Sequence, residues 1–402
     1  MQASLNKIRF VLLLLLLSSF IAANTNAIEL AQITLPLTVN FDDDSVLQSW
    51  IYDRSVWQIA DVEGENVLKG QGLPDKPLIV LGSDDPEWAY PSESDLLIKY
   101  NFRLGTASAS LRMVFNYVEL TGYHVLELTP GRALLKRDDR EGDRNYVTER
   151  NREIILPRGD AMAPIRENTW HSLVMWISDT RVNVYLDQRL VLRVNDEYTP
   201  QVTSGELLFQ VNNQLQPVYL DDLQIQRVQP SSTHFEAGNL TRSWSTGGSG
   251  TVTYGRDAET GNMYAQLENQ LTLTPTIQPL THLYMSCRLW NDAGGFQLLL
   301  TDRDEERLLL DFDQGNLVIT RQEANGTALW TTTLSNFYNR SRWDDFHLRL
   351  RGTALSIYRD GEPRFNGTID AEAMQPVSRI RFSTEAGEVQ RLDDCLITDL
   401  IL

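Results

Sequence analysis

The chain repeats a Leu-Asp-Asp segment followed by alternating apolar residues, and this repeat limits the possible fold most strongly. PVYLDDLQIQ begins at Pro217 and VQRLDDCLIT begins at Val389, so the two Leu-Asp-Asp segments are 172 residues apart. Other landmarks recur in the same order: Phe41 with Phe235 near the start of each copy, then Trp170 with Trp343 and Tyr185 with Tyr358, the last two pairs each 173 residues apart. A shared spacing with unlike residues in between indicates two copies of one domain.

The segments between these landmarks have the pattern of β-strands. LLIKYNFRL from Leu96, LRMVFNY from Leu111 and YHVLEL from Tyr123 are short, alternating, and rich in branched and aromatic residues. Asp360-Gly361 is a typical hairpin turn. No long stretch has helical periodicity. The sequence therefore predicts an all-β fold of two tandem β-sandwich domains of the jelly-roll type.

The predicted domain organisation begins with an export signal. Residues 1–27 combine Lys7 and Arg9, an apolar run too short to span a bilayer, and the small residues Thr25-Asn26-Ala27. The first jelly roll is expected at 33–228, with a charged insertion at 136–168, and the second at 234–402. We therefore expect a secreted, extracellular protein.

Charge narrows the class of partner. The formal net charge of −18 argues against nucleic acid and anionic membranes. It suits a neutral ligand such as an extracellular glycan, or bound divalent cations. The sequence leaves the oligomeric state open.

The two cysteines, Cys287 and Cys395, are too few for a disulfide scaffold or a cysteine zinc site. Aligning the two copies places Cys287 with Phe102 and Cys395 with Leu223, which are expected core positions. We therefore predict that both cysteines are buried in the second domain. A single disulfide and two buried thiols both remain open.

The order of these motifs resembles a known superfamily. Phe-Asp/Glu followed by Trp, strands that end in Phe102-Arg103 or Cys287-Arg288, a strand opened by Trp, and a closing Asp-Asp strand are similar to the concanavalin A-like lectin/glucanase superfamily in its laminin-G-like form. Domains similar to the 3-keto-disaccharide hydrolases share this layout. The resemblance implies a jelly roll, and it implies little about function because this fold hosts lectins, glycosidases and adhesive modules.

No catalytic constellation accompanies the resemblance. Retaining glycosidases of the superfamily carry Glu-x-Asp-x-x-Glu on one strand, and this sequence has no such run; Glu127 stands alone in VLEL. The favoured hypothesis is a non-catalytic module that binds extracellular carbohydrate. A hydrolase acting on a glycan or modified sugar is the first alternative, and a structural or adhesive module is the second.

Paired acidic residues suggest structural calcium. If the first and last strands of each domain lie side by side, Asp221 would approach Asp42, and Asp393 would approach Glu236. Simple alternation would also place Asp221 on the inward face with Leu223. The full set of candidate calcium ligands is Asp42, Asp221, Asp222, Glu236, Asp393 and Asp394.

Exposed aromatic residues are the expected glycan contacts. Trp88, Tyr90 and Tyr117 are the leading candidates, because Trp88 and Tyr90 lie in a polar stretch, DDPEWAYPSES, and Tyr117 follows the MVFN strand. Trp290 and Trp330 are weaker candidates. Four tryptophans recur at matched sites and are assigned to the cores: Trp50, Trp170, Trp244 and Trp343.

Overall fold

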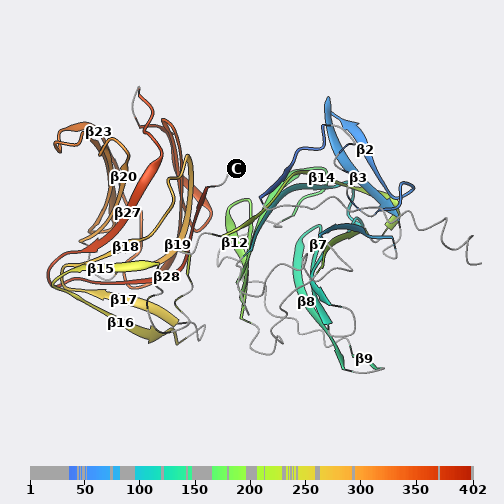
Figure 1. Cartoon of the computed structure of the whole chain (residues 1–402), viewed down its shortest axis with the longest axis horizontal. Coiled ribbons are helices and arrows are strands. Elements are labelled where there is room, and N and C mark those ends of the chain that lie inside the picture. The colour runs from blue at the N-terminus through green and yellow to red at the C-terminus, as the bar shows by residue number, and fades with distance from the viewer. Residues whose placement is uncertain are drawn as a thin grey trace, which may run out of the picture.

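The structure is a computed structural model in which every named element is a β-strand (Figure 1). It describes residues 36–399 except 43–44, 46, 48–49, 51, 73–75, 82–95, 119–121, 142–143, 147–164, 179–180, 196–205, 212, 229–231, 234, 236–237, 239, 241–242, 259–262, 292–294 and 370–371. Within these residues, no helix has the length and apolar character needed to cross a bilayer. The predicted export signal lies outside them.

The first sandwich consists of two antiparallel sheets. Sheet 1 has the order β12 (Arg189–Asn195), β11 (Arg181–Leu186), β10 (Trp170–Ser178), β5 (Leu96–Leu104), β14 (Asn213–Arg227), β3 (Glu65–Gly72) and β2 (Trp57–Val62), and β1 (Leu37–Val39) also pairs with β14. Sheet 2 has the order β4 (Leu78–Leu81), β13 (Glu206–Val211), β6 (Leu111–Val118), β7 (Gly122–Thr129), β8 (Arg132–Glu141) and β9 (Arg144–Tyr146). The predicted charged insertion thus begins as the β8–β9 hairpin.

The second sandwich repeats this strand order. Sheet 3 has the order β15 (Trp244–Gly248), β18 (Leu271–Pro275), β27 (Val377–Thr384), β20 (Phe296–Asp302), β21 (Arg307–Asp313), β22 (Asn316–Gln322) and β23 (Ala328–Leu334). Sheet 4 has the order β16 (Thr251–Arg256), β17 (Met263–Glu268), β28 (Val389–Asp399), β19 (His282–Asn291), β24 (Trp343–Arg351), β25 (Ala354–Arg359) and β26 (Glu362–Thr368). Sheet 4 corresponds to sheet 1 strand for strand, so the prediction of two tandem β-sandwiches is confirmed.

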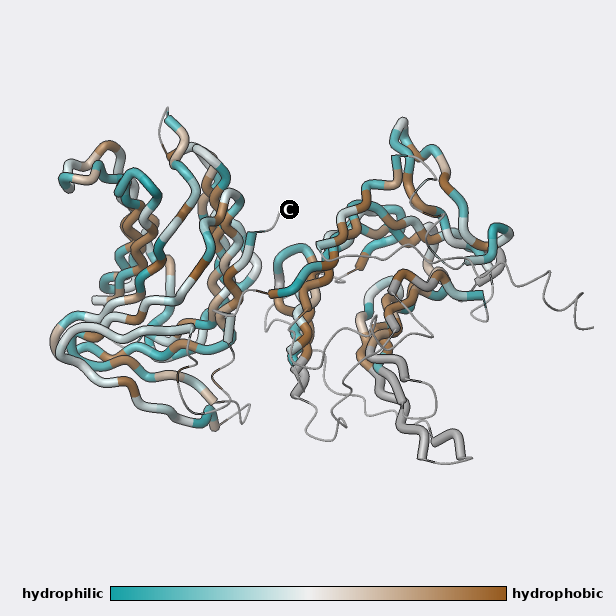
Figure 2. The backbone as a smooth tube through the Cα atoms, viewed as in Figure 1, coloured by the Kyte–Doolittle hydropathy of each residue, from teal (hydrophilic) through white to brown (hydrophobic). Residues whose placement is uncertain are grey.

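Each sandwich has its own apolar core between its two sheets, visible as apolar segments on the facing strands (Figure 2). Trp50 packs edge-on against Phe41 in the first core, and Trp244 packs against Phe235 in the second, as predicted. The same assignment is wrong for Trp170 and Trp343. Both are only partly buried, because inward and outward positions alternate along β10 and β24 and each tryptophan occupies an outward one.

The two cysteines are buried and form a disulfide between β19 and β28, with Cα atoms 4.2 Å apart. Burial in one domain is therefore confirmed, but the alignment behind it is wrong by two residues. Trp170 lies opposite Arg103 and the corresponding Trp343 lies opposite Trp290, so Arg103 corresponds to Trp290. Three residues earlier on each strand, Cys287 therefore corresponds to Tyr100 and not to Phe102. The burial prediction held because a shift of two residues returns a side chain to the same face of a sheet.

The repeated Leu-Asp-Asp segment forms a β-bulge in both closing strands. Asp222 and Asp394 have positive φ angles of 50° and 49°, and the register of β14 and β28 against β5 and β19 shifts there. A bulge adds one residue to one strand and reverses its alternation. Asp221 lies opposite Asn101 on the outer face of sheet 1, so its predicted inward phase is wrong. Aspartate suits the bulge because it tolerates the left-handed conformation.

The predicted closure of each sandwich by its own first segment agrees with the strand pairing. In the first sandwich, β1 pairs with β14, and Val39 lies opposite Leu223. In the second, Thr233 forms a β-bridge with Cys395 in β28. The exact domain boundaries at 33–228 and 234–402 stay a prediction.

The two sandwiches pack through the outer faces of sheets 1 and 4. A third apolar cluster joins residues of both: Leu97, Val174, Trp176, Tyr185 and Val228 from the first, and Tyr284 and Leu396 from the second. Trp176 and Leu396 are fully buried. Across this interface, Tyr185 packs edge-on against His347, and Gln226 donates a hydrogen bond of 2.7 Å to the hydroxyl of Thr398. The outer faces of sheets 1 and 4 are therefore covered in part by each other.

Candidate functional site

The structure places few of the sequence-predicted glycan contacts. Trp88 and Tyr90 lie outside the described residues. Tyr117 lies on β6, opposite Glu206, and only its backbone is described. The prediction that these three residues bind carbohydrate therefore stays a prediction.

A different group of aromatic residues gathers on the outer face of sheet 4. Tyr264 on β17, Trp290 on β19 and Trp343 on β24 are all partly buried. The ring centroids of Tyr264 and Trp290 each lie 5.7 Å from that of Trp343, in edge-to-face geometry. We call these three residues, together with Arg288 and Arg391, the aromatic face.

The two arginines of the aromatic face lie over its rings. The guanidinium carbon of Arg391 is 4.9 Å from the ring centroid of Trp290 and 5.3 Å from that of Tyr264. Arg288 lies 4.8 Å from the ring centroid of Trp343, whose indole N–H donates a hydrogen bond to Asp257. Such cation–π contacts hold planar side chains in fixed orientations. The aromatic face is therefore an ordered surface with both apolar and hydrogen-bonding groups.

The sequence contained a partial signal for this surface. Trp290 was a weaker candidate, whereas Trp343 was assigned to the core and Tyr264 was not selected. The alternation along β24 could have identified Trp343. Phe346, Leu348 and Leu350 point inward, so Trp343, three residues before Phe346, points outward.

The first sandwich has one aromatic–arginine pair at the corresponding place on its outer sheet face, with the arginine and the aromatic residue exchanged between the two strands. Arg103 occupies the position that corresponds to Trp290, and Tyr219 the position that corresponds to Arg391. Arg103 lies 5.9 Å from the ring centroid of Tyr219. It also pairs with Glu63 at 2.8 Å. One aromatic–arginine pair is thus present in both sandwiches, while the cluster of three rings is described only in the second.

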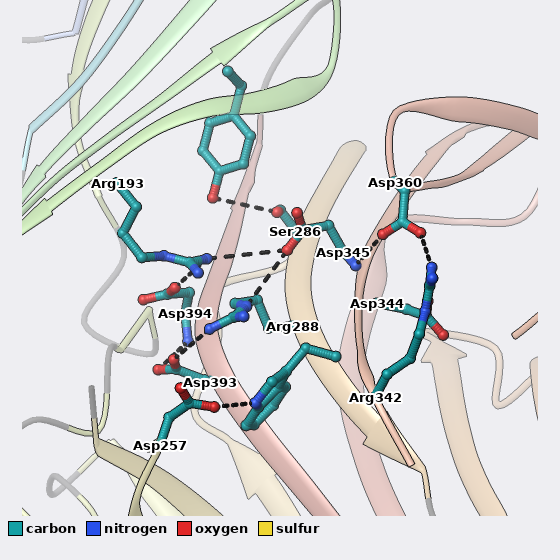
Figure 3. Close-up of polar contacts among 12 residues, drawn as sticks. Arg193, Asp257, Ser286, Arg288, Arg342, Asp344, Asp345, Asp360, Asp393 and Asp394 are labelled. Carbon is teal, nitrogen blue, oxygen red and sulfur yellow. Dashed lines mark hydrogen bonds and ion pairs between the residues drawn. The ribbon is translucent and has the colours of Figure 1, made fainter. Parts of the chain in front are cut away.

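Next to the aromatic face, five charged side chains join the two sandwiches (Figure 3). Arg193 on β12 of the first sandwich pairs with Asp394 and lies 4.0 Å from Asp345. Arg288 lies 3.7 Å from Asp345 and 3.5 Å from Asp393. We call these five residues the ion lock. Arg288 belongs to both groups and connects them.

The ion lock is buried except at Asp345, whose side chain is 28% exposed. The side chains of Asp393 and Asp394 are 1% exposed, that of Arg193 is 5% exposed and that of Arg288 is 12% exposed. Burial and the nearby charge of Arg193 lower the pKa of Arg288, but an arginine remains protonated throughout the accessible pH range. Removing one member of a buried ion pair is costly, because the other charge stays buried without compensation. The lock therefore needs both arginines.

The ion lock bears on the calcium prediction for the second sandwich. Asp393 and Asp394 were candidate calcium ligands, and in the structure both face arginines. Glu236, the third candidate there, lies outside the described residues. Among the residues that the structure describes, no group of three or more His, Cys, Asp or Glu side chains is arranged to hold a metal ion.

The acidic corner of the first sandwich differs, because neither Asp221 nor Asp222 forms an ion pair with an arginine among the described residues, although the charge of Lys99 acts on both. Asp222 accepts a hydrogen bond of 2.8 Å from the amide of Asn101. Burial, together with the charges of Asp222, Glu65 and Asp42, raises the pKa of Asp221 to about 6, while a hydrogen bond from the backbone of Asp222 opposes this rise. Asp42 and Asp221 thus lie close enough to interact, as the sequence predicted.

Comparisons with known proteins give no family. No family model and no curated protein matches the chain. Among solved structures, it is similar to the cellulose-induced protein Cip1 (14% identity, 42% of this chain and 98% of that chain, TM-score 0.37). It is also similar to the carbohydrate-binding module CBM66 from Bacillus subtilis (12%, 40% and 98%, 0.29) and the CBM22-1–CBM22-2 tandem domain of Paenibacillus barcinonensis Xyn10C (13%, 90% and 97%, 0.24). At these TM-scores the likenesses assign neither family nor function.

Proposed function

We propose that this protein is an exported, non-catalytic module that binds extracellular carbohydrate through the aromatic face of its second sandwich. The observation that supports this proposal is the grouping of Tyr264, Trp290 and Trp343 on one partly exposed sheet face. A sugar ring has C–H groups on its faces and hydroxyls around its edge. Aromatic rings suit the first and charged or amide groups suit the second.

The charges around the aromatic face favour a neutral glycan. Arg288 and Arg391 are accompanied by Asp257, Asp345 and Asp393, and the whole chain has a net charge of −18. An acidic polysaccharide would meet net repulsion on approach. The arginines would instead hydrogen-bond to sugar hydroxyls while their planar faces rest on the rings.

Replacing Trp290 by alanine is expected to weaken glycan binding about tenfold, since one stacked aromatic contact contributes about 1–1.5 kcal/mol. We would measure retardation of the mature chain in native gels that contain a soluble β-glucan, xylan or arabinan. Trp330→Ala is the matched control: Trp330 was also a weaker glycan candidate and is also partly buried, but it packs on Phe365 and makes none of the contacts of the aromatic face. The control should bind like the wild type.

Three outcomes would count against this function. Equal retardation of wild type and Trp290→Ala would exclude the aromatic face as the site. Stronger binding to polygalacturonate than to the neutral polymers would contradict the charge argument. Release of reducing sugar from any polymer would favour the hydrolase alternative.

We also propose that a structural calcium ion binds at the acidic corner of the first sandwich, where Asp42, Asp221 and Asp222 would have to draw closer together to hold it. The support is the burial of Asp221 and the repulsion from its acidic neighbours, which together raise its pKa. A hard divalent cation would neutralise such a group of carboxylates and accept their oxygens as ligands. It would also fasten β1 to β14 where the first sandwich closes.

In calcium-free buffer, Asp221→Asn is expected to raise the melting temperature at pH 7.5 and to have no effect near pH 4. The folded-state pKa of about 6 lies above the ordinary value of 3.8, so the charged carboxylate destabilises the fold above pH 6. This penalty disappears as the pH falls below the unfolded-state pKa. Added calcium should stabilise only the wild type, so that at pH 7.5 the wild type then melts at a higher temperature than Asp221→Asn.

Thermal melts at both pH values, with calcium and with EDTA, provide the measurement. Asp304→Asn is the control, because Asp304 is exposed in the loop after β20. Calcium that stabilises wild type and Asp221→Asn equally would argue against this site. A gain in stability that persists at pH 4 would contradict the electrostatic explanation.

A further inference from the structure

The contact between the two sandwiches has an approximate twofold relation. Gln226 and Thr398 occupy corresponding positions on β14 and β28, four residues after the bulge residues Asp222 and Asp394, and they hydrogen-bond to each other. Leu97 and Tyr284 also correspond, and both lie in the shared apolar cluster. Corresponding residues meet in this way only near a twofold axis between equal faces.

The ion lock breaks this relation. Arg193 lies opposite Asn183 on β11, and the corresponding pair on β25 and β26 is Ser356 and Asn366. If the twofold relation held here, Asn366 would meet Asp222 in the way that Arg193 meets Asp394. Asp222 instead accepts a hydrogen bond from Asn101 of its own sandwich. Among the described residues, the ion pair between the sandwiches therefore forms at the bulge of the second sandwich and not at that of the first, and the three grouped aromatic rings are likewise found on the second.

We propose that the first sandwich positions the carbohydrate site of the second, with Arg193 as the positioning residue; this inference rests on the function proposed above. Arg193 neutralises Asp394 and shares Asp345 with Arg288. Arg288 then stays with Asp393 and lies over the ring of Trp343. Docking of the two sandwiches thereby completes the aromatic face.

The physical reason is the charge balance inside the lock. Two arginines face three aspartates, and Asp393 and Asp394 are almost fully buried. Without Arg193, Asp394 would lack its cation, and Arg288 is the nearest remaining cation in the lock. Attraction to Asp394 would draw Arg288 away from Trp343, which would then lose the cation that orients its ring.

The test compares three variants of the full chain. Arg193→Gln removes the cation. Arg193→Gln combined with Asp394→Asn also removes the buried charge that would attract Arg288, and asparagine tolerates the positive φ angle of position 394. Tyr185→Phe is the control, because it removes a 3.4 Å hydrogen bond from Ser286 across the same interface and none of the five charged groups of the ion lock.

The first readout needs no carbohydrate. The indole N–H resonance of Trp343 is assigned by its loss in Trp343→Phe, and its position is measured in nitrogen-labelled protein. We expect a shift in Arg193→Gln, near wild-type positions in the double variant, and no change in Tyr185→Phe. The second readout is retardation in β-glucan gels, where Arg193→Gln should bind about tenfold more weakly and the double variant should recover.

Small-angle scattering separates positioning from loss of docking. If Arg193→Gln stays compact and the Trp343 resonance does not move, the inference is wrong. If the sandwiches separate and both the resonance and the binding stay unchanged, it is also wrong. Separation with loss of both supports dependence of the site on docking. A wild-type chain that binds none of the polymers would refute the proposed function, and the resonance shift would still test the role of Arg193.

Discussion

Removing the Cys287–Cys395 disulfide should lower the free energy of unfolding of the second sandwich by about 4 kcal/mol. The bond closes a loop with a sequence separation of 108 residues, and a loop of that length loses much conformational entropy in the unfolded chain when it is cross-linked. Both sulfur atoms are buried, so alanine at both positions leaves little unsatisfied polarity. Urea unfolding of the double alanine variant provides the measurement.

The first sandwich serves as an internal control in this experiment. It contains no cysteine, and its closing strand has Leu223 where β28 has Cys395. In a Trp176→Ala background, in which the two sandwiches are expected to unfold separately, its own transition should move much less than that of the second sandwich. Unchanged unfolding of the whole chain after loss of both sulfurs, or equal losses in the two transitions, would contradict the expected local effect.

Replacing Trp176 by alanine should uncouple the unfolding of the two sandwiches. The Trp176 side chain is completely buried in the apolar cluster between sheets 1 and 4. Truncating a buried tryptophan typically costs about 3–5 kcal/mol, and here most of that loss would fall on the contact between the sandwiches. Scanning calorimetry should change from one cooperative transition to two separate ones.

Trp330→Ala provides the comparison for this experiment, because Trp330 lies on β23, away from the interface, and packs against Phe365. It should lower the stability of the second sandwich and leave the pattern of transitions as it is in the wild type. A single transition in Trp176→Ala, or two transitions already in the wild type, would show that the contact does not couple the two cores.

The repeated landmarks were enough to predict the architecture. Matched spacing and period-2 patterns depend on local backbone preference and on burial of one sheet face, and both can be read from sequence. The inward residues of β19 and β28, the burial of the cysteines, and the cores around Trp50 and Trp244 followed from these patterns. A two-residue error in aligning Cys287 did no harm, because it preserved the face.

The site was less accessible to sequence reasoning for two physical reasons. The bulges at Asp222 and Asp394 reverse the alternation within one strand, so the phase extended back from Leu223 placed Asp221 on the wrong face. The contact between sheets 1 and 4 brings Arg193 to Asp394 across 201 positions of sequence, and no local pattern records such a meeting. Outward tryptophans such as Trp343 also look apolar and core-like until their strand phase is known.

The exchanged aromatic–arginine pair has a consequence for how the two halves of the chain can be compared. Arg103 and Tyr219 face each other across two strands, and Trp290 and Arg391 do the same with the roles reversed. A position-by-position comparison scores two mismatches there, although the contact is the same in both halves. What has been retained is a relation between two sites rather than the residue at either one. Methods that score pairs of positions jointly should therefore detect more kinship between the halves than methods that score each position alone.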